Sequence, residues 1–147
     1  MKRSFFVFVE IASYASPGMV DLANKSRSAN ITCFFATQSP SDLDSTLGPT
    51  FKEQMIENCN NLIVMRQNSA INANYLSEII GTTGTMGITH QLHDNGLDIS
   101  QTGFGSARSI REFICPPDDI KNFRTGEAFF LSKDTGACCK IKIHKPF

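Results

Sequence analysis

The sequence predicts an α/β fold, with a largely parallel sheet, flanking helices and a C-terminal β-hairpin, in a single domain of 147 residues. Two observations carry this prediction. Over about the first eighty residues, short apolar runs alternate with segments of helical spacing, which is the order of parallel strands joined by crossover helices. After Gly81 the chain becomes polar, glycine-rich and alternating, which indicates antiparallel hairpins.

The first strand is predicted at residues 4–9, a continuous run of Ser-Phe-Phe-Val-Phe-Val. Such a run is typical of a central strand that is buried on both faces. Pro17-Gly18 opens a helical segment over residues 19–28. Residues 29–37, rich in Ile, Cys and Phe, predict the second strand, which leads into Gln38.

Residues 39–42 predict a turn with helix-capping chemistry. A helix is expected over 51–59, a third short buried strand over 62–65, and a helix over 70–80 that Gly81 ends. The apolar positions at helical spacing are Phe51, Met55, Ile56 and Cys59 in the first of these helices, and Ile71, Tyr75, Leu76 and Ile79 in the second.

The polar segment 82–105 predicts a protruding hairpin or a long loop, with a turn at 94–96, and residues 107–115 predict a strand. The run Pro116-Pro117-Asp118-Asp119-Ile120 predicts a helix start, with a single turn that ends near Phe123. Two strands close the chain, at 128–131 and 140–145, and the second alternates as an edge strand with Ile141 and Ile143 inward.

The bulk composition describes an ordinary globular protein. The formal net charge is zero, so any DNA contact is expected to be a local patch. Five cysteines without a C-x-x-C pair indicate reduced thiols that serve as small core residues in a cytoplasmic compartment. His90 and His93 stand alone, so a polar turn is favoured there and no metal site is expected.

Polar residues follow the first two strands: Glu10 ends one and Gln38 ends the other. Ligands of open α/β sheets gather at the carboxyl ends of the strands, so both side chains are expected in one crevice. There, a carboxylate can activate a water that attacks a γ-phosphate, and an amide can bind that water or the phosphate. The simpler alternative is that Glu10 is a surface acid and Gln38 a turn residue.

Arg27 follows a helix and precedes a buried strand, which places it at the opposite edge of the sheet from Glu10. From that edge it could cross a subunit boundary and meet the phosphate of a neighbouring subunit. On spacing alone, a solvated basic helix end is the favoured interpretation. Arg66, at the end of the third strand, competes for the same role.

Two expected features of a nucleotide motor are missing from the sequence. No G-x-x-x-x-G-K-[ST] motif occurs, and the Gly/Thr-rich segment 81–87 lacks the lysine. The residue before Glu10 is Val9, where an aspartate would support Mg²⁺.

A set of ordered blocks covers nearly the whole chain and resembles conjugative coupling proteins of the TraD/TraG type. The blocks are Phe8–Ala15, Asn24–Ala29, Ala36–Ser39 with Asp42-Leu43, Glu57–Asn61 with Val64–Arg66, Ile80–Thr82, and Pro117–Phe123 with Thr125–Ala128. Members of this family are hexameric, RecA-like ATPases of the inner membrane in type IV secretion systems.

The resemblance implies that residues 1–147 are the C-terminal portion of a RecA-like motor domain, from the Walker B strand onward. Glu10 matches the catalytic Walker B glutamate, Gln38 the glutamine that senses the γ-phosphate, and Arg27 a basic residue acting in trans. ATP and Mg²⁺ are the implied cofactors of the full-length protein, with Glu10 and Gln38 at the nucleotide. The isolated chain is expected to bind no cofactor and to show no ATPase activity.

The implied partners are further copies in a hexameric ring, single-stranded DNA, relaxosome proteins and the secretion channel, at the cytoplasmic face of the inner membrane. The membrane anchor and the Walker A loop would lie upstream. Val9 departs from the family, whose members usually have Asp there. A second hypothesis therefore stays open: a catalytically inactive module for binding or oligomerisation.

Overall fold

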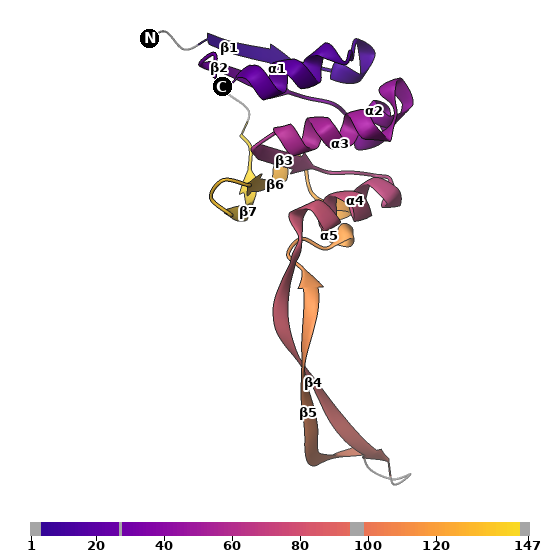
Figure 1. The fold of residues 1–147 in the computed structure, drawn as a ribbon. Coiled ribbons are helices and arrows are strands. Elements are labelled where there is room, and N and C mark those ends of the chain that lie inside the picture. Colours follow the sequence, from indigo (N-terminus) through magenta and orange to yellow (C-terminus); the bar gives the residue numbers. More distant parts are fainter. Residues whose placement is uncertain (1–3, 27, 95–98, 145–147) are drawn as a thin grey trace.

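The computed structural model describes residues 4–26, 28–94 and 99–144, and these form helices and strands in an α/β arrangement (Figure 1). In chain order the elements are β1 (Ser4–Phe8), the 3-10 helix η1 (Ile11–Ser13), α1 (Gly18–Ser26), β2 (Ile31–Phe35), α2 (Pro40–Leu47), α3 (Pro49–Asn58), β3 (Asn61–Met65), α4 (Ala70–Ile80), β4 (Thr82–Asp94), β5 (Ile99–Phe113), α5 (Pro117–Asn122), β6 (Glu127–Ser132) and β7 (Cys138–Lys142).

β1 and β2 form a parallel pair, in which Phe8 lies opposite Phe35. The rings of these two residues stack with their centroids 5.2 Å apart. They pack against a core from η1, α1, α2 and α3, so these helices cover one face of the pair. The buried members of this first core are Ile11, Met19, Leu43, Phe51 and Met55.

The opposite face of the β1–β2 pair is uncovered in the described part of the chain. Successive side chains of a strand point to opposite faces, so Phe5 and Val7 point away from Phe8. Phe5 is 64% and Val7 55% exposed, and Phe34, opposite Val7 on β2, is 45% exposed. The prediction that the first strand is buried on both faces is therefore wrong, because no described element packs on this open face.

β3 departs from the predicted parallel arrangement. It pairs antiparallel with β6, and β6 pairs antiparallel with β7, in the order β3-β6-β7. The α/β class is thus confirmed, with β1 and β2 as its parallel part and β6–β7 as the predicted C-terminal hairpin. In the described residues, β2 and β3 share no ladder, so each keeps one edge unpaired.

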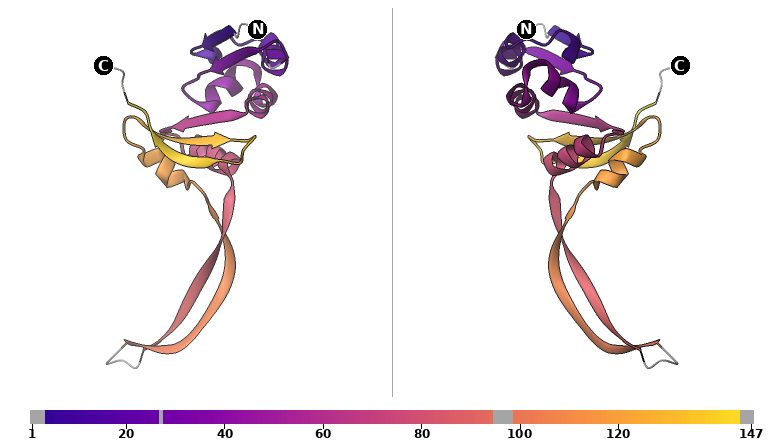
Figure 2. Two further views of the ribbon diagram at one scale, coloured as in Figure 1. Left: turned by 90° about the vertical axis from the view of Figure 1, so that its left-hand side faces the viewer. Right: turned by 90° about the vertical axis from the view of Figure 1, so that its right-hand side faces the viewer.

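The second core lies between β3, β6, α4 and α5. It contains Val64, Ala73, Leu76, Ile80, Cys115, Ile120, Phe123 and Phe129. Figures 1 and 2 show β3 between the β1–β2 pair and the β6–β7 hairpin, so the first core lies on the β1–β2 side of the body and the second core on the β6–β7 side.

β4 and β5 form a twisted two-stranded ribbon that projects away from the body (Figures 1 and 2). The ladder runs from Thr82 opposite Phe113 to Asp94 opposite Ile99, with a register shift between His90 and Leu92. The predicted protruding hairpin is confirmed. The strand predicted at 107–115 overlaps the C-terminal part of β5, the second strand of this hairpin. His90 and His93 therefore lie in a strand and not in the predicted turn, while Asn95 and Gly96 lie outside the described residues.

Three finer predictions differ from the structure. The expected turn at 39–42 begins the helix α2, because Ser39 and Asp42 form a capping box. Ile71 is 79% exposed on α4, although its spacing predicted an inward position. The last strand ends at Lys142, which leaves Ile143 beyond it and 44% exposed.

All five cysteines are free, and of these Cys115 is the buried one. No described helix combines the length and the apolar character needed to span a membrane.

Candidate functional site

The candidate site lies at the carboxyl ends of β1 and β2. Beyond the strands, the Ala36 N–H donates to the Phe8 carbonyl at 2.8 Å, and the Ile11 N–H donates to the Ala36 carbonyl at 3.0 Å. Glu10 lies between Phe8 and Ile11, and Gln38 follows Ala36 by two residues. The two predicted residues therefore come from adjoining parallel strands and leave the sheet at the same end.

Glu10 has a left-handed backbone conformation, with φ 54° and ψ 51°. Its neighbours hold it there: the Tyr14 hydroxyl donates to the Val9 carbonyl at 2.7 Å, and Ile11 is anchored in the first core. The Glu10 side chain itself is exposed and has no hydrogen-bond or ion-pair partner in the described part of the chain. A fixed backbone thus presents a free carboxylate at the end of the strand.

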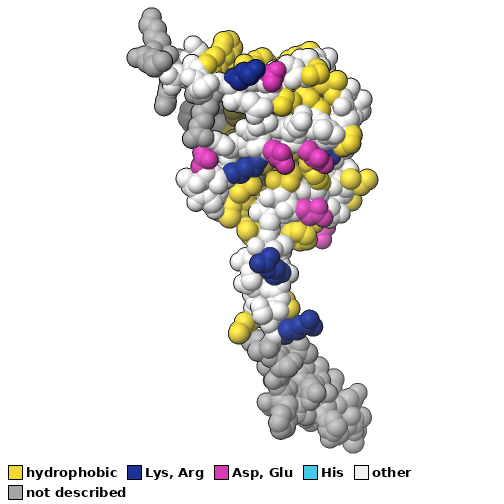
Figure 3. All heavy atoms as spheres, viewed as in Figure 1, with side chains coloured by type: hydrophobic (Ala, Val, Ile, Leu, Met, Phe, Trp, Pro, Cys, Tyr) yellow, Lys and Arg dark blue, Asp and Glu magenta, His cyan; other side chains and the backbone are white. Residues whose placement is uncertain are grey.

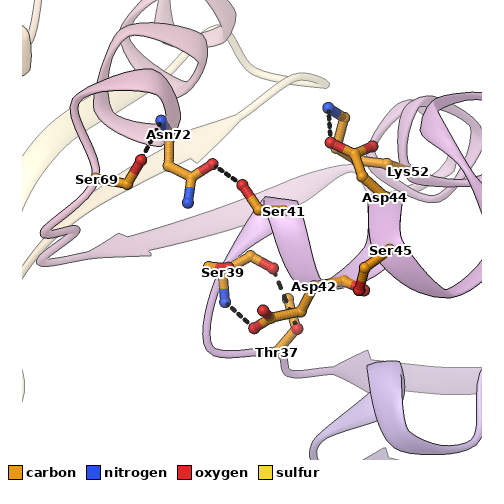
Figure 4. Close-up of polar contacts among 9 residues, drawn as sticks. All are labelled: Thr37, Ser39, Ser41, Asp42, Asp44, Ser45, Lys52, Ser69 and Asn72. Carbon is orange, nitrogen blue, oxygen red and sulfur yellow. Dashed lines mark hydrogen bonds and ion pairs between the residues drawn. The ribbon is translucent and has the colours of Figure 1, made fainter.

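Gln38 lies on the turn between β2 and α2. The Ser39 N–H donates to Asp42 Oδ2 at 3.1 Å, which fixes the start of α2 directly after Gln38 (Figure 4). On the other side, Gln67 Nε2 donates to the Gln38 carbonyl at 3.2 Å. Both bonds hold the backbone of this turn and leave the exposed Gln38 amide available to a ligand.

Polar contacts tie this edge to the second half of the molecule. Ser41 Oγ, on α2, donates to Oδ1 of the buried Asn72, on α4, at 2.6 Å, and Figure 4 shows the two side chains pointing toward one another. Lys52 Nζ lies 2.8 Å from Asp44 Oδ2 and 4.3 Å from the centroid of the Tyr75 ring. The ends of β2 and β3 are therefore held together although the strands do not pair.

The other candidate residues are placed differently. Arg27 lies outside the described residues. Arg66 is exposed just after β3, at the same edge as Gln67. Gly81 ends α4 and the rest of the Gly/Thr-rich segment lies in β4, so this segment forms no phosphate loop. The side chains of His90 and His93 are outside those described.

Sequence reasoning did not single out Gln67 and the Ser41–Asn72 pair. Gln67 had a usable signal, because it follows a predicted strand in the same way as Gln38 follows its own. The Ser41–Asn72 hydrogen bond joins residues that are far apart in the chain, and no local sequence pattern predicts such a contact.

A nucleotide fits this edge only in part. Glu10 and Gln38 could meet a terminal phosphate and its attacking water. The sequence contains no glycine-rich loop with a lysine to cradle the other phosphates, and Val9 offers only an apolar side chain where a Mg²⁺ shell would need oxygen.

The parallel strand pair with polar residues at its carboxyl end belongs to an α/β fold, and solved structures of conjugative coupling proteins share this fold. The structure of the unbound bacterial conjugative coupling protein TrwBdeltaN70 matches with a TM-score of 0.80 and 19% identity, over 99% of this chain and 33% of that one. TrwB in complex with the GTP analogue GDPNP matches with a TM-score of 0.76 and 19% identity, over 99% and 32%. TrwB with ADP and Mg²⁺ matches with a TM-score of 0.73 and 18% identity, over the same shares, 99% and 32%.

The family model described as the TraM recognition site of TraD and TraG matches residues 4–124. The chain belongs to this family of conjugative coupling proteins. It spans about a third of the length of the coupling-protein structures that it matches. No curated protein matches it by sequence.

Proposed function

We propose that this chain is the C-terminal portion of the motor domain of a conjugative, DNA-translocating ATPase. In this proposal the complete protein forms a hexameric ring at the cytoplasmic face of the inner membrane. It delivers relaxase-bound single-stranded DNA to a type IV secretion channel, with ATP as its fuel.

One observation carries the proposal: Glu10 and Gln38 follow the carboxyl ends of two adjoining parallel strands, and the side chains of both are exposed there. In this arrangement Glu10 would activate the attacking water and Gln38 would sense the γ-phosphate. Arg27 would complete the site of a neighbouring subunit. The relatives support the choice of ligand, because TrwB structures contain GDPNP, ADP with Mg²⁺, and an ATP analogue.

The unpaired edges of β2 and β3 support the need for a second segment. An unpaired edge exposes a row of N–H and C=O groups that can pair with another strand. A strand that carries the phosphate-binding loop could pair with these edges. It would then bring that loop to the same edge of the sheet as Glu10 and Gln38. Val9 would leave Mg²⁺ to ligands from that second segment and from the nucleotide.

The test combines this chain with a polypeptide of the same conjugative system that carries the Walker A segment. DNA-stimulated release of phosphate from ATP is measured for each part and for the mixture. We expect activity only in the mixture, and a loss of about a hundredfold or more for Glu10→Gln, because the water would lose its base. Gln38→Ala is expected to lower the rate as well.

Glu53→Gln is the matched control, since Glu53 is an exposed acid on α3, away from the strand ends. A mixture that hydrolyses ATP equally well with Glu10→Gln would contradict the proposal. So would turnover by this chain alone that survives the same substitution.

The second candidate function is a binding module without catalysis. The Val9 position and the family description, which names TraM recognition, favour it. Calorimetric titration of this chain with TraM from the same system tests it, and saturable binding by a chain that never rescues hydrolysis would support it. Absence of binding to TraM, together with monomeric behaviour, would exclude it.

A further inference from the structure

A small hollow lies beside the end of β3, and neither Glu10 nor Gln38 is among its lining residues. Its volume is about 220 Å³, and Met65 and Phe123 form its apolar wall. Ligand pockets for drug-sized molecules hold roughly 300–1,000 Å³, so this one suits a single small group.

Two arginines, Arg66 and Arg124, are among the residues that line the hollow. Both side chains are exposed, and no carboxylate among the described residues lies within ion-pair distance of either. Their charges are therefore available to an external anion. The arginine fork matches the geometry of oxyanions and can bind them through two parallel hydrogen bonds.

The nearest acid is already engaged. Glu127 Oε2 accepts the Arg124 N–H at 2.8 Å and lies 3.4 Å from Lys140 Nζ. The hydrogen bond from the Arg124 N–H and, to a smaller extent, the contact with Lys140 hold the pKa of Glu127 below its ordinary value. This carboxylate therefore stays ionised and is already bound by these two groups. The hollow keeps an excess of positive charge.

The turn that carries Arg124 is rigidly built. The Glu127 N–H donates to the Arg124 carbonyl at 2.9 Å, which closes a turn with Gly126 at φ +83°. A Cβ on Gly126 would lie 2.6 Å from the Ile143 carbonyl oxygen, so the backbone is packed closely against the next segment. Thr125 and Gly126 also line the hollow, and their N–H groups meet no acceptor in the described part of the chain, so they are available as further donors.

We propose that this hollow binds a phosphate group, held by the side chains of Arg66 and Arg124 and by the turn at Thr125-Gly126. The two guanidinium groups and the two backbone N–H groups offer more donors than the two oxygens of a carboxylate can use. A phosphate presents three or four oxygens and therefore matches this set of donors better. The group can belong to a nucleotide or to the backbone of a nucleic acid. The inference needs no hydrolytic role for Glu10 and stands independently of the proposed function.

Nuclear magnetic resonance titration of the full, ¹⁵N-labelled chain tests the site at constant ionic strength. The probes are inorganic phosphate, ATP and an oligothymidylate, each added separately. We expect saturable shifts of the Thr125 and Gly126 amide signals, and an affinity at least about tenfold lower in Arg66→Gln and in Arg124→Gln, because each removes a charge-assisted contact.

Arg108→Gln is the control, since Arg108 is an exposed arginine on the projecting ribbon and its substitution changes the net charge equally. Tighter binding of ATP than of phosphate assigns the site to nucleotides, and tighter binding of the oligonucleotide assigns it to nucleic acid. Absence of saturable shifts, or an equal loss in Arg108→Gln, overturns the proposal. Because nothing is hydrolysed, failure of the mixed ATPase assay would leave this result unaffected.

Discussion

Glu10 adopts a left-handed backbone conformation that costs a side chain with a Cβ about 1–2 kcal/mol, and it does so at the end of a strand where a ligand could bind. The bonds on both sides of it, from Tyr14 to Val9 and from Ile11 to Ala36, hold the conformation in place. Strain kept at an exposed acid is typical of a functional position.

The Glu10 backbone gives a first prediction. Glu10→Gly should be at least as stable as the natural chain, because glycine adopts φ 54° without a steric cost, and Glu10→Val should be about 1–2 kcal/mol less stable than Glu10→Gly. Urea unfolding followed by circular dichroism measures both. A glycine variant that is less stable than the valine variant would show that the conformation is not strained.

Gly126 gives a second prediction. Gly126→Ala should destabilise the fold by more than about 2 kcal/mol, because the new Cβ would meet the Ile143 carbonyl and the backbone φ is positive. Gly136→Ala is the matched control: its φ is +66° and nothing lies within 4 Å of a Cβ, so only the conformational cost of about 1 kcal/mol applies. Equal losses in the two variants would mean that the close approach at Gly126 relaxes freely.

Cys115 gives a third prediction, on pH. Burial, assisted by Asp119, raises the pKa of Cys115 to about 11. The folded thiol therefore keeps its proton while the unfolded thiol loses it from its ordinary value of 9.0 upward. The unfolded state binds fewer protons in this range, so stability falls as the pH rises from about 9 to 11. The unfolding free energy of Cys115→Ala should depend less steeply on pH over that interval, and an identical slope would contradict the assignment.

At the scale of elements, the clearest feature is the ribbon of β4 and β5. Its two strands pair with one another and leave the body near Gly81 and Ile114, where the Ile114 N–H donates to the Gly81 carbonyl at 3.0 Å. Exposed apolar and basic side chains are found on its described part, and Figure 3 shows the blue arginine side chains there.

The ribbon gives a fourth prediction. Replacing residues 84–111 by Asn-Gly would join Thr83 to Glu112, which lie opposite one another, through a tight two-residue turn. The thermal midpoint of the body should change by only a few degrees, because both cores lie outside the replaced segment. Loss of cooperative unfolding in the shortened chain would show that the ribbon supports the cores.

The elements differ in how far the sequence could predict them. α4 was predicted with its correct bounds because Gly81, at φ 98°, provides an unambiguous end signal. α2 was missed because Pro40 and Ser41 read as a turn, and the reciprocal capping bonds of Ser39 and Asp42 that begin the helix are a property of three dimensions. β3 was found at its place, but strand order is set by distant partners such as β6 and not by local pattern.

At the scale of the whole molecule, the adjoining placement of Glu10 and Gln38 could be predicted, because parallel strands joined by one crossover helix tend to be neighbours. The open face could not. An apolar run such as residues 4–9 predicts that the strand is buried, but it does not identify the segment that packs on each of its faces.

The open face gives the fifth prediction. Replacing Phe5 and Val7 together by Thr should reduce self-association measured by light scattering, because exposed apolar sheet faces promote it, and should leave stability within about 1 kcal/mol. Phe8→Ala is the comparison: Phe8 stacks on Phe35 and packs on the first core, so its loss should destabilise the fold by about 2–4 kcal/mol without reducing association. A double variant that associates as strongly as the natural chain would assign association to another surface.

The unpaired edges of β2 and β3 have a mechanical consequence. Within the described residues, β2 and β3 share no ladder, and hydrogen bonds from single side chains, such as Ser41–Asn72 and Gln67–Gln38, join the two halves. A strand inserted between β2 and β3 would form backbone hydrogen bonds along its whole length to both strands and would connect the two halves rigidly. Any displacement of that strand would then be transmitted rigidly from the Glu10 side of the molecule to the base of the ribbon.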